Sequence, residues 1–362
     1  MAAMSLRARL AAALPELKER GLHRHHAAEA DEAYRACGAQ RPDAVPDAAT
    51  LARVEQYAGD VLGSRAYAPW LKAYTAWRGR FVEGWLPDNY FAAVVIPAIQ
   101  NLRTKRVSGA KTLARRTLMS ELLPDLASHV RGCWLDRDGR PVAPQDVAGL
   151  LFAQTDAVFV KLDRSARGRD IHRITREAFD LERVAALGDF VVQAPVVAAA
   201  ELAAVNPESL SPMRITTVKR RGAPAEARTA SVVFGRAGAA WMRADTAIVV
   251  SVVDAEGNLN DYGLDHHWQR CTAHPDSGVA FAGIRVPAFA EARAAACALH
   301  DRVPHLAIIG WDFAIDRDHR PRILELNTGH VGFKASEAMV GPLFAGLGWE
   351  QLWRKKAVEL GW

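Results

Sequence analysis

The sequence predicts an α+β protein in which a mainly helical N-terminal region precedes a strand-rich region. Residues 1–105 are rich in alanine and arginine and have a helical pattern. After residue 212 the segments MRITTVKR, TASVVFG and TAIVVSVVDAEGNL carry the branched and alternating residues of strands. Helices first, followed by a mixed and strand-rich half, favour the α+β class.

Further elements are expected from the same patterns. They are a helix-like stretch at 111–130, strands at 157–162 and 189–194, a helix at 288–302 and a final helix at 347–358. We interpret the aromatic residues at 70–90 as core packing where the N-terminal region meets the rest, with recognition of an acceptor molecule as the alternative.

The composition is typical of a globular chain of two or three domains. The 362 residues are 50% hydrophobic and 24% charged, and the net charge of +5 is spread thinly. No basic run has the interleaved aromatic residues of a nucleic-acid-binding surface. The four cysteines lie far apart, which fits a reducing cytoplasm. No apolar stretch reaches the roughly 20 residues of a membrane span, so no nucleic-acid partner and no membrane insertion are expected.

The segment GWDFAIDRDHRPRILELNTG, residues 310–329, is the most informative one. Apolar and polar residues alternate on both sides of a short polar link, which predicts two strands joined by a turn. One face of this hairpin is expected to enter the core, and its residues are Trp311, Phe313, Ile315, Leu324 and Leu326.

The opposite face of the hairpin carries Asp312, Glu325 and Asn327. With the turn centred between Asp318 and His319, the two carboxylates stand directly opposite each other, with Cβ atoms roughly 5 Å apart. Such a pair repels unless one member is protonated or a cation lies between them, and these oxygen donors suit Mg²⁺. The alternative is a solvated polar face in which a bulge shifts the register and separates the pair.

Two further segments carry side chains that suit a nucleotide. In VFVKLDRSARGRDIHRI a strand ends near Lys161 and is followed by a polar loop that contains Gly168. This arrangement suits the binding of phosphates. The alternative is an edge-strand lysine beside a solvated loop. In residues 189–218 a strand ends at Gln193 and a new strand begins near Arg214. The linker between them can offer backbone groups to an adenine. Arg214 can bind phosphate, although an arginine at a strand start is more often a surface charge.

A rival set of side chains offers atoms compatible with zinc. It comprises His266, His267, Cys271 and His274, which fall within nine positions, and the segment HRHH at 23–26 adds further histidines. Structural zinc sites usually have tighter paired spacings, so we favour loop residues here and place His274 near a nucleotide or acceptor pocket.

Four segments, in order along the chain, resemble blocks of the ATP-grasp superfamily and, within it, of the sugar-transfer-associated ATP-grasp family. They are VVQAPVV, NPESLSPMRITTV, HPDSG and GWDFAIDRDHRPRILELNTG, and the resemblance covers about residues 100–330. The last segment is the most specific, because its Asp is followed thirteen residues later by E-x-N. The resemblance implies two α+β subdomains that clasp ATP. The implied organisation is a helical N-terminal region at 1–105, a small lid subdomain at 106–190, and a large subdomain at 191–362 with the metal site and a C-terminal helix.

The resemblance also implies roles for individual residues. Asp312, Glu325 and Asn327 would bind the Mg²⁺ that bridges the ATP phosphates, and Arg214 would act near the transferring phosphate. The implied nucleotide-binding positions are Lys111 (with Lys105 as a competing choice), Lys161, Arg167, Gly168 and Arg169 in the lid loop, Gln193 and Val196 at the adenine, and Glu201 at the ribose.

Three features depart from the family pattern. The lid loop DRSARGRD has one glycine and three arginines where many relatives have a glycine-rich loop, so arginine charge is expected to replace backbone amides there. Pro212 stands where a residue with an N–H is expected. His319 stands in the hairpin turn where glycine is usual, which argues against a strict two-residue turn.

By this resemblance the protein is expected to be an ADP-forming, Mg²⁺-dependent carboxylate–amine ligase of a biosynthetic pathway. ATP would phosphorylate a small-molecule carboxylate, and an amine would attack the acyl phosphate, while the protein supplies positioning and charge neutralisation. Two alternatives remain open. They are kinase-like phosphoryl transfer to a hydroxyl, and a nucleotide-binding accessory protein of polysaccharide assembly without turnover. The intact metal trio argues against the second alternative, because a pure binder does not need it.

Overall fold

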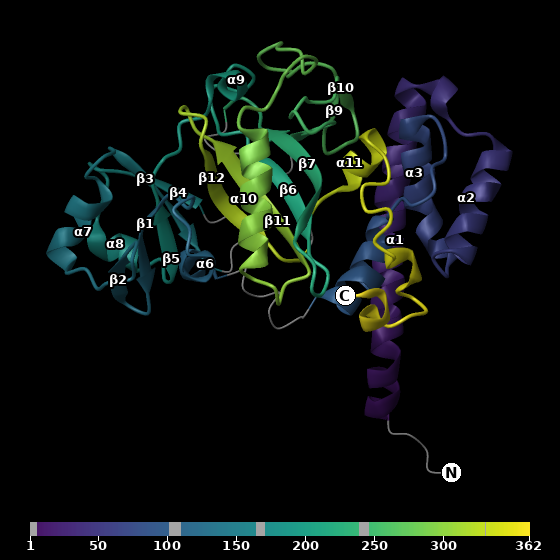
Figure 1. Ribbon diagram of the computed structural model, residues 1–362, viewed down its shortest axis with the longest axis horizontal. Helices are drawn as coiled ribbons and strands as arrows, with labels where there is room; N and C mark the ends of the chain where they lie inside the picture. Colours follow the sequence, from purple (N-terminus) through teal and green to yellow (C-terminus); the bar gives the residue numbers. More distant parts are fainter. Residues whose placement is uncertain (1–5, 101–109, 164–170, 239–245, 330) are drawn as a thin grey trace. The chain divides into compact units, whose positions relative to one another are not determined.

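In the computed structural model the described residues are 6–100, 110–163, 171–238, 246–329 and 331–362 (Figure 1). The chain divides into two compact units. The first comprises Met1–Gln100, His267–Arg270 and Phe333–Trp362, and the second comprises Asn101–His266 and Cys271–Gly332. The α+β class and the helical N-terminal region are confirmed. None of the described helices combines the length and apolar character needed to cross a bilayer.

Helices make up the first unit. They are α1 (Leu6–Gln40), α2 (Ala48–Asp60), α3 (Ala68–Arg78), α4 (Asp88–Tyr90), α5 (Ile96–Ile99) and α11 (Lys334–Met339), with a π-helical turn at Phe91–Val95. Asp47 begins α2 because its side chain accepts a hydrogen bond from the backbone N–H of Thr50. Gly79 ends α3 in the left-handed conformation, with φ of 75°, which glycine adopts without strain.

Aromatic side chains form the core of the first unit. The rings of Trp70 and Tyr74 stack with centroids 5.7 Å apart. Trp77, Trp85 and Tyr90 are also buried. Large rings supply much buried apolar area per residue, which a unit of short helices needs. The interpretation of these residues as core packing is confirmed.

The second unit contains two antiparallel sheets (Figure 1). The five-stranded sheet has the order β2 (Cys133–Asp136), β1 (Asp125–Val130), β5 (Phe190–Gln193), β3 (Ala157–Leu162) and β4 (Ile171–Thr175). The seven-stranded sheet has the order β10 (Arg270–Cys271), β9 (Gly263–Leu264), β8 (Ile248–Ser251), β7 (Glu226–Phe234), β6 (Met213–Val218), β11 (Ile308–Ile315) and β12 (Pro321–Asn327).

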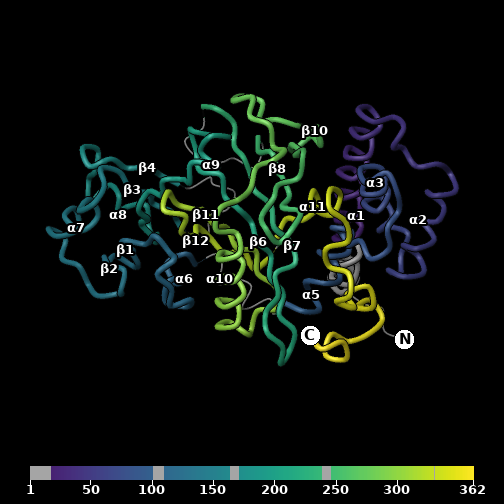
Figure 2. Tube along the Cα trace, turned by 45° about the horizontal axis from the view of Figure 1, so that its top comes forward, coloured from purple at the N-terminus to yellow at the C-terminus, as the bar shows by residue number. Residues whose placement is uncertain are grey.

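Helices cover the sheets of the second unit and create two hydrophobic cores. The helices are α6 (Lys111–Leu118), α7 (Pro144–Leu151), α8 (Leu181–Ala185), α9 (Ala200–Ala203) and α10 (Phe289–Asp301). Figure 1 shows α10 across the face of β6, β7 and β11, where its buried residues Phe289, Ala292 and Ala296 follow helical spacing. Figure 2 shows the β11–β12 hairpin on the side of its sheet that lies next to the five-stranded sheet.

The predicted hairpin forms, with one change of register. Asp312 pairs with Glu325, but the register shifts between Asp312 and Phe313, and Phe313 pairs with Ile323. This bulge reverses the expected roles of two neighbours. Ile323 is 0% exposed and lies in the core, whereas Leu324, which the alternation assigned to the core, is only half-buried. A bulge inserts one residue and therefore exchanges the faces of the residues beyond it.

The turn of the hairpin is not a strict two-residue turn. His319 adopts φ of 55°, in the left-handed region where a glycine was expected. The side chain of Asp316 accepts hydrogen bonds from the backbone N–H groups of Asp318 and Arg320 and from Nε of Arg322. These bonds hold the turn and compensate for the missing glycine.

A buried polar chain ties α10 to the seven-stranded sheet. Nε1 of Trp311 donates to Oγ1 of Thr217 over 2.8 Å, and this hydroxyl lies 2.7 Å from Nδ1 of His300. Nε2 of His300 donates to the carbonyl oxygen of Leu306 over 2.9 Å. Burial, the largest cause, lowers the pKa of His300 to about 4, so the ring is neutral in the folded protein at pH 7.

Two sequence-based expectations for helices are wrong. The stretch 111–130 is helical only to Leu118, and β1 begins at Asp125 because its backbone pairs with β2 and β5. In place of a helix at 347–358 the structure has short 3-10 turns at Trp349–Gln351 and Ala357–Leu360. Residues 333–362 group with the first unit, whereas the sequence analysis assigned them to the large subdomain.

The bulge can be tested by comparing two neighbouring substitutions. Ile323→Ala is expected to lower the free energy of unfolding by about 2–5 kcal/mol, because it leaves a cavity in the core. Leu324→Ala is expected to cost about 1 kcal/mol or less, because that side chain is half-buried. Urea unfolding curves measure both values. Equal costs, or a larger cost at Leu324, would contradict the observed register.

The buried state of His300 makes a pH-dependent contribution to stability. The folded-state pKa of about 4 lies below the ordinary value of 6.5, so the unfolded chain binds more protons between these pH values. The free energy of unfolding is therefore expected to fall as pH drops from 6.5 toward 4, by up to about 1.4 kcal/mol per unit. His300→Gln keeps a donor and an acceptor but cannot titrate, and should show a shallower slope. Urea unfolding at several pH values measures it, and identical slopes for both proteins would sink the argument.

Candidate functional site

Three charged residues occupy one cross-strand row of the seven-stranded sheet. Arg214 of β6 pairs with Asp312 of β11, and Asp312 pairs with Glu325 of β12. Residues that pair directly across neighbouring strands point to the same face. The predicted opposition of Asp312 and Glu325 is confirmed, because the bulge lies on the turn side of the pair.

Arg214 binds Asp312 through two parallel hydrogen bonds. Nε donates to Oδ1 over 2.6 Å, and Nη2 donates to Oδ2 over 2.7 Å. Its third nitrogen, Nη1, donates to the carbonyl oxygen of Val331 over 3.3 Å. Burial alone lowers the pKa of Arg214, but the charge of Asp312 and its hydrogen bonds outweigh this and raise the pKa. The main contact of the Arg214 guanidinium is therefore the one with Asp312.

Two lysines lie beside Glu325. Nζ of Lys111 is 3.6 Å from Oε1 of Glu325, and Nζ of Lys161 donates to the carbonyl oxygen of Leu324 over 3.3 Å. Burial raises the pKa of Glu325, and Asp312 adds to this, while Lys111 opposes it. Burial lowers the pKa of Lys161, and Glu325 opposes that shift. Burial therefore disfavours the charged form of both side chains. A bound cation would favour the charged form of Glu325, and a bound anion would favour the charged form of Lys161.

A carboxylate clamp positions both lysines. Asp163, just after β3, accepts hydrogen bonds from the backbone N–H of Thr112 (3.0 Å) and from its hydroxyl (2.8 Å). Thr112 follows Lys111 in the first turn of α6, and Lys161 lies two residues before Asp163. One clamp therefore fixes the start of the helix and the end of the strand that carry the two ammonium groups.

Gln193 makes a buried contact inside the five-stranded sheet. It pairs with Asp125 across β1 and β5, and its Nε2 donates to Oδ1 of Asp125 over 2.8 Å. Burial raises the pKa of Asp125, and this hydrogen bond partly opposes the shift. The side chain of Gln193 is thus committed to Asp125, which leaves the adjoining linker backbone as the group that can meet a base.

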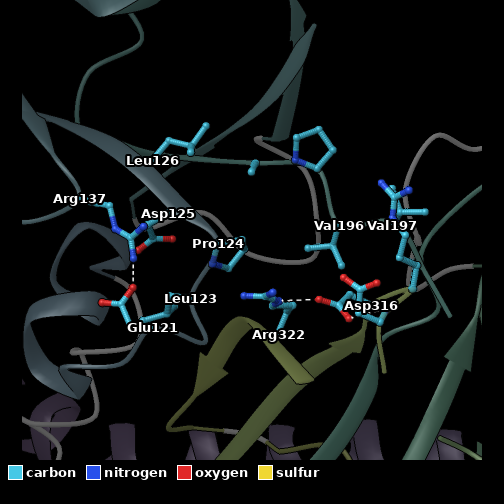
Figure 3. Close-up of a pocket in the computed structure, with 14 residues that line it drawn as sticks. Glu121, Leu123, Pro124, Asp125, Leu126, Arg137, Val196, Val197, Asp316 and Arg322 are labelled. Carbon is cyan, nitrogen blue, oxygen red and sulfur yellow. Dashed lines mark hydrogen bonds and ion pairs between the residues drawn. The ribbon is translucent and has the colours of Figure 1, made fainter. Parts of the chain in front are cut away.

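Two cavities adjoin these residues. The larger has a volume of about 450 Å³ and is lined by the linker from Ala194 to Val197, with Pro124 and Leu126 opposite (Figure 3). Figure 3 shows the Arg137–Glu121 pair on one side of it and the Arg322–Asp316 pair on the other. The smaller cavity, of about 20 Å³, touches Lys111, Gln193 and Glu325. Asp125 and Leu123 line both cavities and separate them.

The structure therefore brings together six of the predicted site residues: Lys111, Lys161, Arg214, Asp312, Glu325 and Asn327. Val196 lines the larger cavity. Glu201 is exposed and pairs with His319 at 3.2 Å, outside both cavities. Arg167, Gly168 and Arg169, as well as the competing Lys105, lie outside the described residues.

The rival zinc set is not brought together in the part of the chain that the structure describes. Nε2 of His274 lies 2.8 Å from the carbonyl oxygen of Gly235, and Nδ1 lies 3.3 Å from the backbone nitrogen of Ser277. This ring stabilises a loop and lines neither cavity, so its expected place near a pocket is not observed.

Sequence reasoning missed Asp125 and Asp163. Asp125 follows Pro124 within a stretch interpreted as helical, and only the pairing of β1 with β5 brings it to Gln193. Asp163 follows a strand, where a carboxylate usually faces water. The Lys-x-Asp spacing of Lys161 and Asp163 was the one available signal, and it is too common to identify a clamp.

Residues 165–340 match the model of the family described as sugar-transfer associated ATP-grasp. The resemblance seen in the sequence is thereby confirmed over this range, while residues 100–164 lie before the match. No curated protein matches the sequence.

Three of the solved structures that are similar to this chain are the following. D-alanine-D-alanine ligase from Coxiella burnetii has 14% identity and a TM-score of 0.42, over 72% of this chain and 59% of that chain. Biotin carboxylase from Campylobacter jejuni has 10% identity and a TM-score of 0.45, over 76% and 52%. N5-carboxyaminoimidazole synthetase from Staphylococcus aureus has 10% identity and a TM-score of 0.36, over 61% and 44%. The chain spans less than two thirds of each of these proteins.

The likeness to this family comes from the sequence match and not from these distant structures. Residues 165–340, which include β6, β11 and β12 with Arg214, Asp312 and Glu325, match the model of the sugar-transfer associated ATP-grasp family.

Proposed function

We propose that this protein is an ATP- and Mg²⁺-dependent ligase that activates a carboxylate as an acyl phosphate and joins it to an amine. One observation carries the proposal. The opposed carboxylates Asp312 and Glu325 lie beside the ammonium groups of Lys111 and Lys161. Paired carboxylates for a divalent ion, next to cations for phosphate, are the parts that phosphoryl transfer from a nucleotide requires.

The donor atoms fit Mg²⁺. The ion takes oxygen ligands, usually one or two carboxylates beside substrate phosphates. Arg214 uses one hydrogen-bonding position on each oxygen of Asp312, and Nδ2 of Asn327 donates to Oδ2 over 3.2 Å. A carboxylate offers about four positions, so Asp312 keeps one, on Oδ1. Burial, the largest cause, raises the pKa of Glu325, so a cation bound beside it would favour its charged form. Asp312, Glu325 and the amide oxygen of Asn327 would hold the ion, which would offset the negative charge of the phosphates.

Lys111 and Lys161 are assigned to the phosphates of ATP. Lys161 is half-buried, and desolvation lowers its pKa, so a polyanion beside it would favour the charged form. The linker from Ala194 to Val197 borders the 450 Å³ cavity, which is large enough for a base and has apolar walls at Pro124 and Val196. The lid residues 167–169 remain assigned to the phosphates on sequence grounds alone.

The proposed reaction has two steps. A carboxylate oxygen of the substrate attacks the γ-phosphorus of ATP, and the bond from phosphorus to the ADP oxygen breaks. The amine nitrogen then attacks the acyl carbon, phosphate leaves, and the nitrogen loses a proton. Neither step needs a nucleophile from the protein, whose work is positioning and charge stabilisation. Arg214 contributes by fixing both oxygens of Asp312.

Isotope transfer tests this chemistry. Candidate acids and amines are screened for release of ADP and phosphate, and the active acid is then labelled with ¹⁸O in its carboxylate. An acyl phosphate predicts ¹⁸O in the released phosphate. Unlabelled phosphate together with an amide product would overturn the route. Accumulation of a phosphorylated hydroxyl would instead establish the kinase alternative, and tight ATP binding without any turnover would favour the accessory protein.

Removing one carboxylate charge should abolish turnover. Glu325→Gln is expected to lower Mg²⁺-dependent ATP turnover by at least about a hundredfold, because it keeps the shape and deletes a charge that offsets the ion. Asp312→Asn should have the same effect and also lower the melting temperature, because Arg214 loses its anionic partner. Exposed Asp261→Asn is the control. Coupled measurement of ADP with thermal denaturation separates the effects, and undiminished turnover in both variants would remove the metal assignment.

Arg214→Lys probes the fork that holds Asp312. Lysine keeps the positive charge but cannot donate two parallel hydrogen bonds to one carboxylate. ATP affinity, measured by calorimetry, is expected to stay within a few-fold, while turnover falls by about two to three orders of magnitude. A fall in ATP affinity with unchanged turnover at saturation would show that Arg214 serves ground-state binding instead.

A further inference from the structure

A second group of ligand-type side chains lies in the first unit, whereas the candidate site belongs to the second. His26 and Glu29 are three residues apart on α1 and so share one helix face, and Asp88 begins α4. Among the described residues they form a group of three potential metal ligands whose donor atoms all lie within 4.8 Å of one another.

The distances within this group fit a single ion. Nδ1 of His26 lies 3.4 Å from Oδ2 of Asp88 and 3.9 Å from Oε2 of Glu29. Around a tetrahedral Zn²⁺ with bonds of about 2.0–2.1 Å, ligand atoms are about 3.3–3.4 Å apart. The distance from His26 to Asp88 already fits, and the distance from His26 to Glu29 exceeds it by about half an ångström. One imidazole nitrogen with two carboxylate oxygens suits Zn²⁺ or Mn²⁺, whereas the all-oxygen set in the second unit suits Mg²⁺.

The group is buried, and a neighbouring hydroxyl lacks a partner. Asp88 is 1% exposed, and His26 is buried. Oη of Tyr74, which is fully buried, has no hydrogen-bond partner among the described residues. Burial is the largest cause that raises the pKa of Tyr74, and the charges of Asp88, Glu337 and Glu29 add to it. A buried hydroxyl without a partner is costly, and a water molecule on a metal ion would donate a hydrogen bond to its oxygen.

Lys334 acts as a cation for the carboxylates in this structure. Its Nζ lies 2.9 Å from Oε2 of Glu29 and 3.4 Å from Oδ2 of Asp88. The same Nζ also stands 4.9 Å from the centroid of the Trp70 ring, whose face is a favourable place for a cation. Lys334 can therefore keep its contact with the Trp70 ring when a stronger cation binds the carboxylates.

We propose that His26, Glu29 and Asp88 bind one divalent transition-metal ion of the Zn²⁺ or Mn²⁺ type, with Lys334 as a built-in competing cation. When the ion binds, the ammonium of Lys334 moves off the carboxylates and remains against Trp70. The long contact of 3.4 Å between Nε1 of Trp70 and Nδ1 of His26 gives way at the same time. The site would tie α1, α4 and α11 together through one ion.

The test uses the full-length chain carrying Glu325→Gln, so that the carboxylate pair of the second unit is impaired as a competing site. Chelator-treated protein is titrated with ZnCl₂ and, separately, with MnCl₂ by calorimetry, and bound metal is counted by elemental mass spectrometry. This parent is expected to bind one ion, and His26→Gln should weaken binding by about a hundredfold. His25→Gln is the matched control, because this exposed neighbour contacts the other oxygen of Glu29 at 3.5 Å. It should bind as the parent does.

Lys334→Met separates a metal site from a purely structural ion pair. Loss of the competing ammonium should tighten metal binding by about tenfold. The metal-free variant should melt at a lower temperature than the parent, and bound metal should raise its melting temperature back to that of the parent. A structural ion pair predicts lower stability and no gain in affinity. The proposal is overturned if the parent and Lys334→Met bind neither ion, or if a folded His26→Gln binds as tightly as the parent. Should His26→Gln fail to fold by circular dichroism, the affinity of Lys334→Met decides alone.

Discussion

The bidentate contact between Arg214 and Asp312 is the constraint on which the candidate site depends. It joins two neighbouring strands at one row, and the same row continues to Glu325. Two opposed carboxylates at this position would repel each other, and the guanidinium offsets one of the two charges. The pair therefore makes it possible to hold a second carboxylate beside Asp312 in a half-buried position. As a consequence, Nε and Nη2 of Arg214 are already hydrogen-bonded to Asp312.

Charge balance also links the two sheets of the second unit. Lys111 and Lys161 come from the side of the five-stranded sheet, yet their ammonium groups contact Glu325 and the backbone of Leu324 in the β11–β12 hairpin. The two hydrogen bonds between Asp163 and Thr112 join the segments that carry Lys161 and Lys111. Entry of a phosphate group would compete with Glu325 for the same ammonium groups. Under the proposed function, nucleotide binding would therefore change the contact between the two sheets.

The first unit solves a different problem. Its helices bury Asp88 and part of Glu29 inside an aromatic core, and unpaired buried charges are costly. Lys334 offsets one charge and packs against the ring of Trp70. The two carboxylates, together with the imidazole of His26, give this core a set of possible metal ligands that packing alone does not require. Both units thus place carboxylates beside a lysine. The group in the second unit offers oxygen donors alone, and the group in the first unit adds the imidazole nitrogen of His26.

The sequence by itself determined the α+β class, the β11–β12 hairpin, and the row that holds Asp312 opposite Glu325, because period-two alternation and turn position are local properties. It misplaced Ile323 and Leu324, since a bulge is chosen by how side chains fit the core and leaves no mark in the alternation. The pairing of β1, which overrode the helix-like pattern of its residues, brought Asp125 to Gln193. Such contacts join residues far apart in the chain, and only tertiary packing decides them, because their free energy depends on burial and on partners that no local pattern specifies.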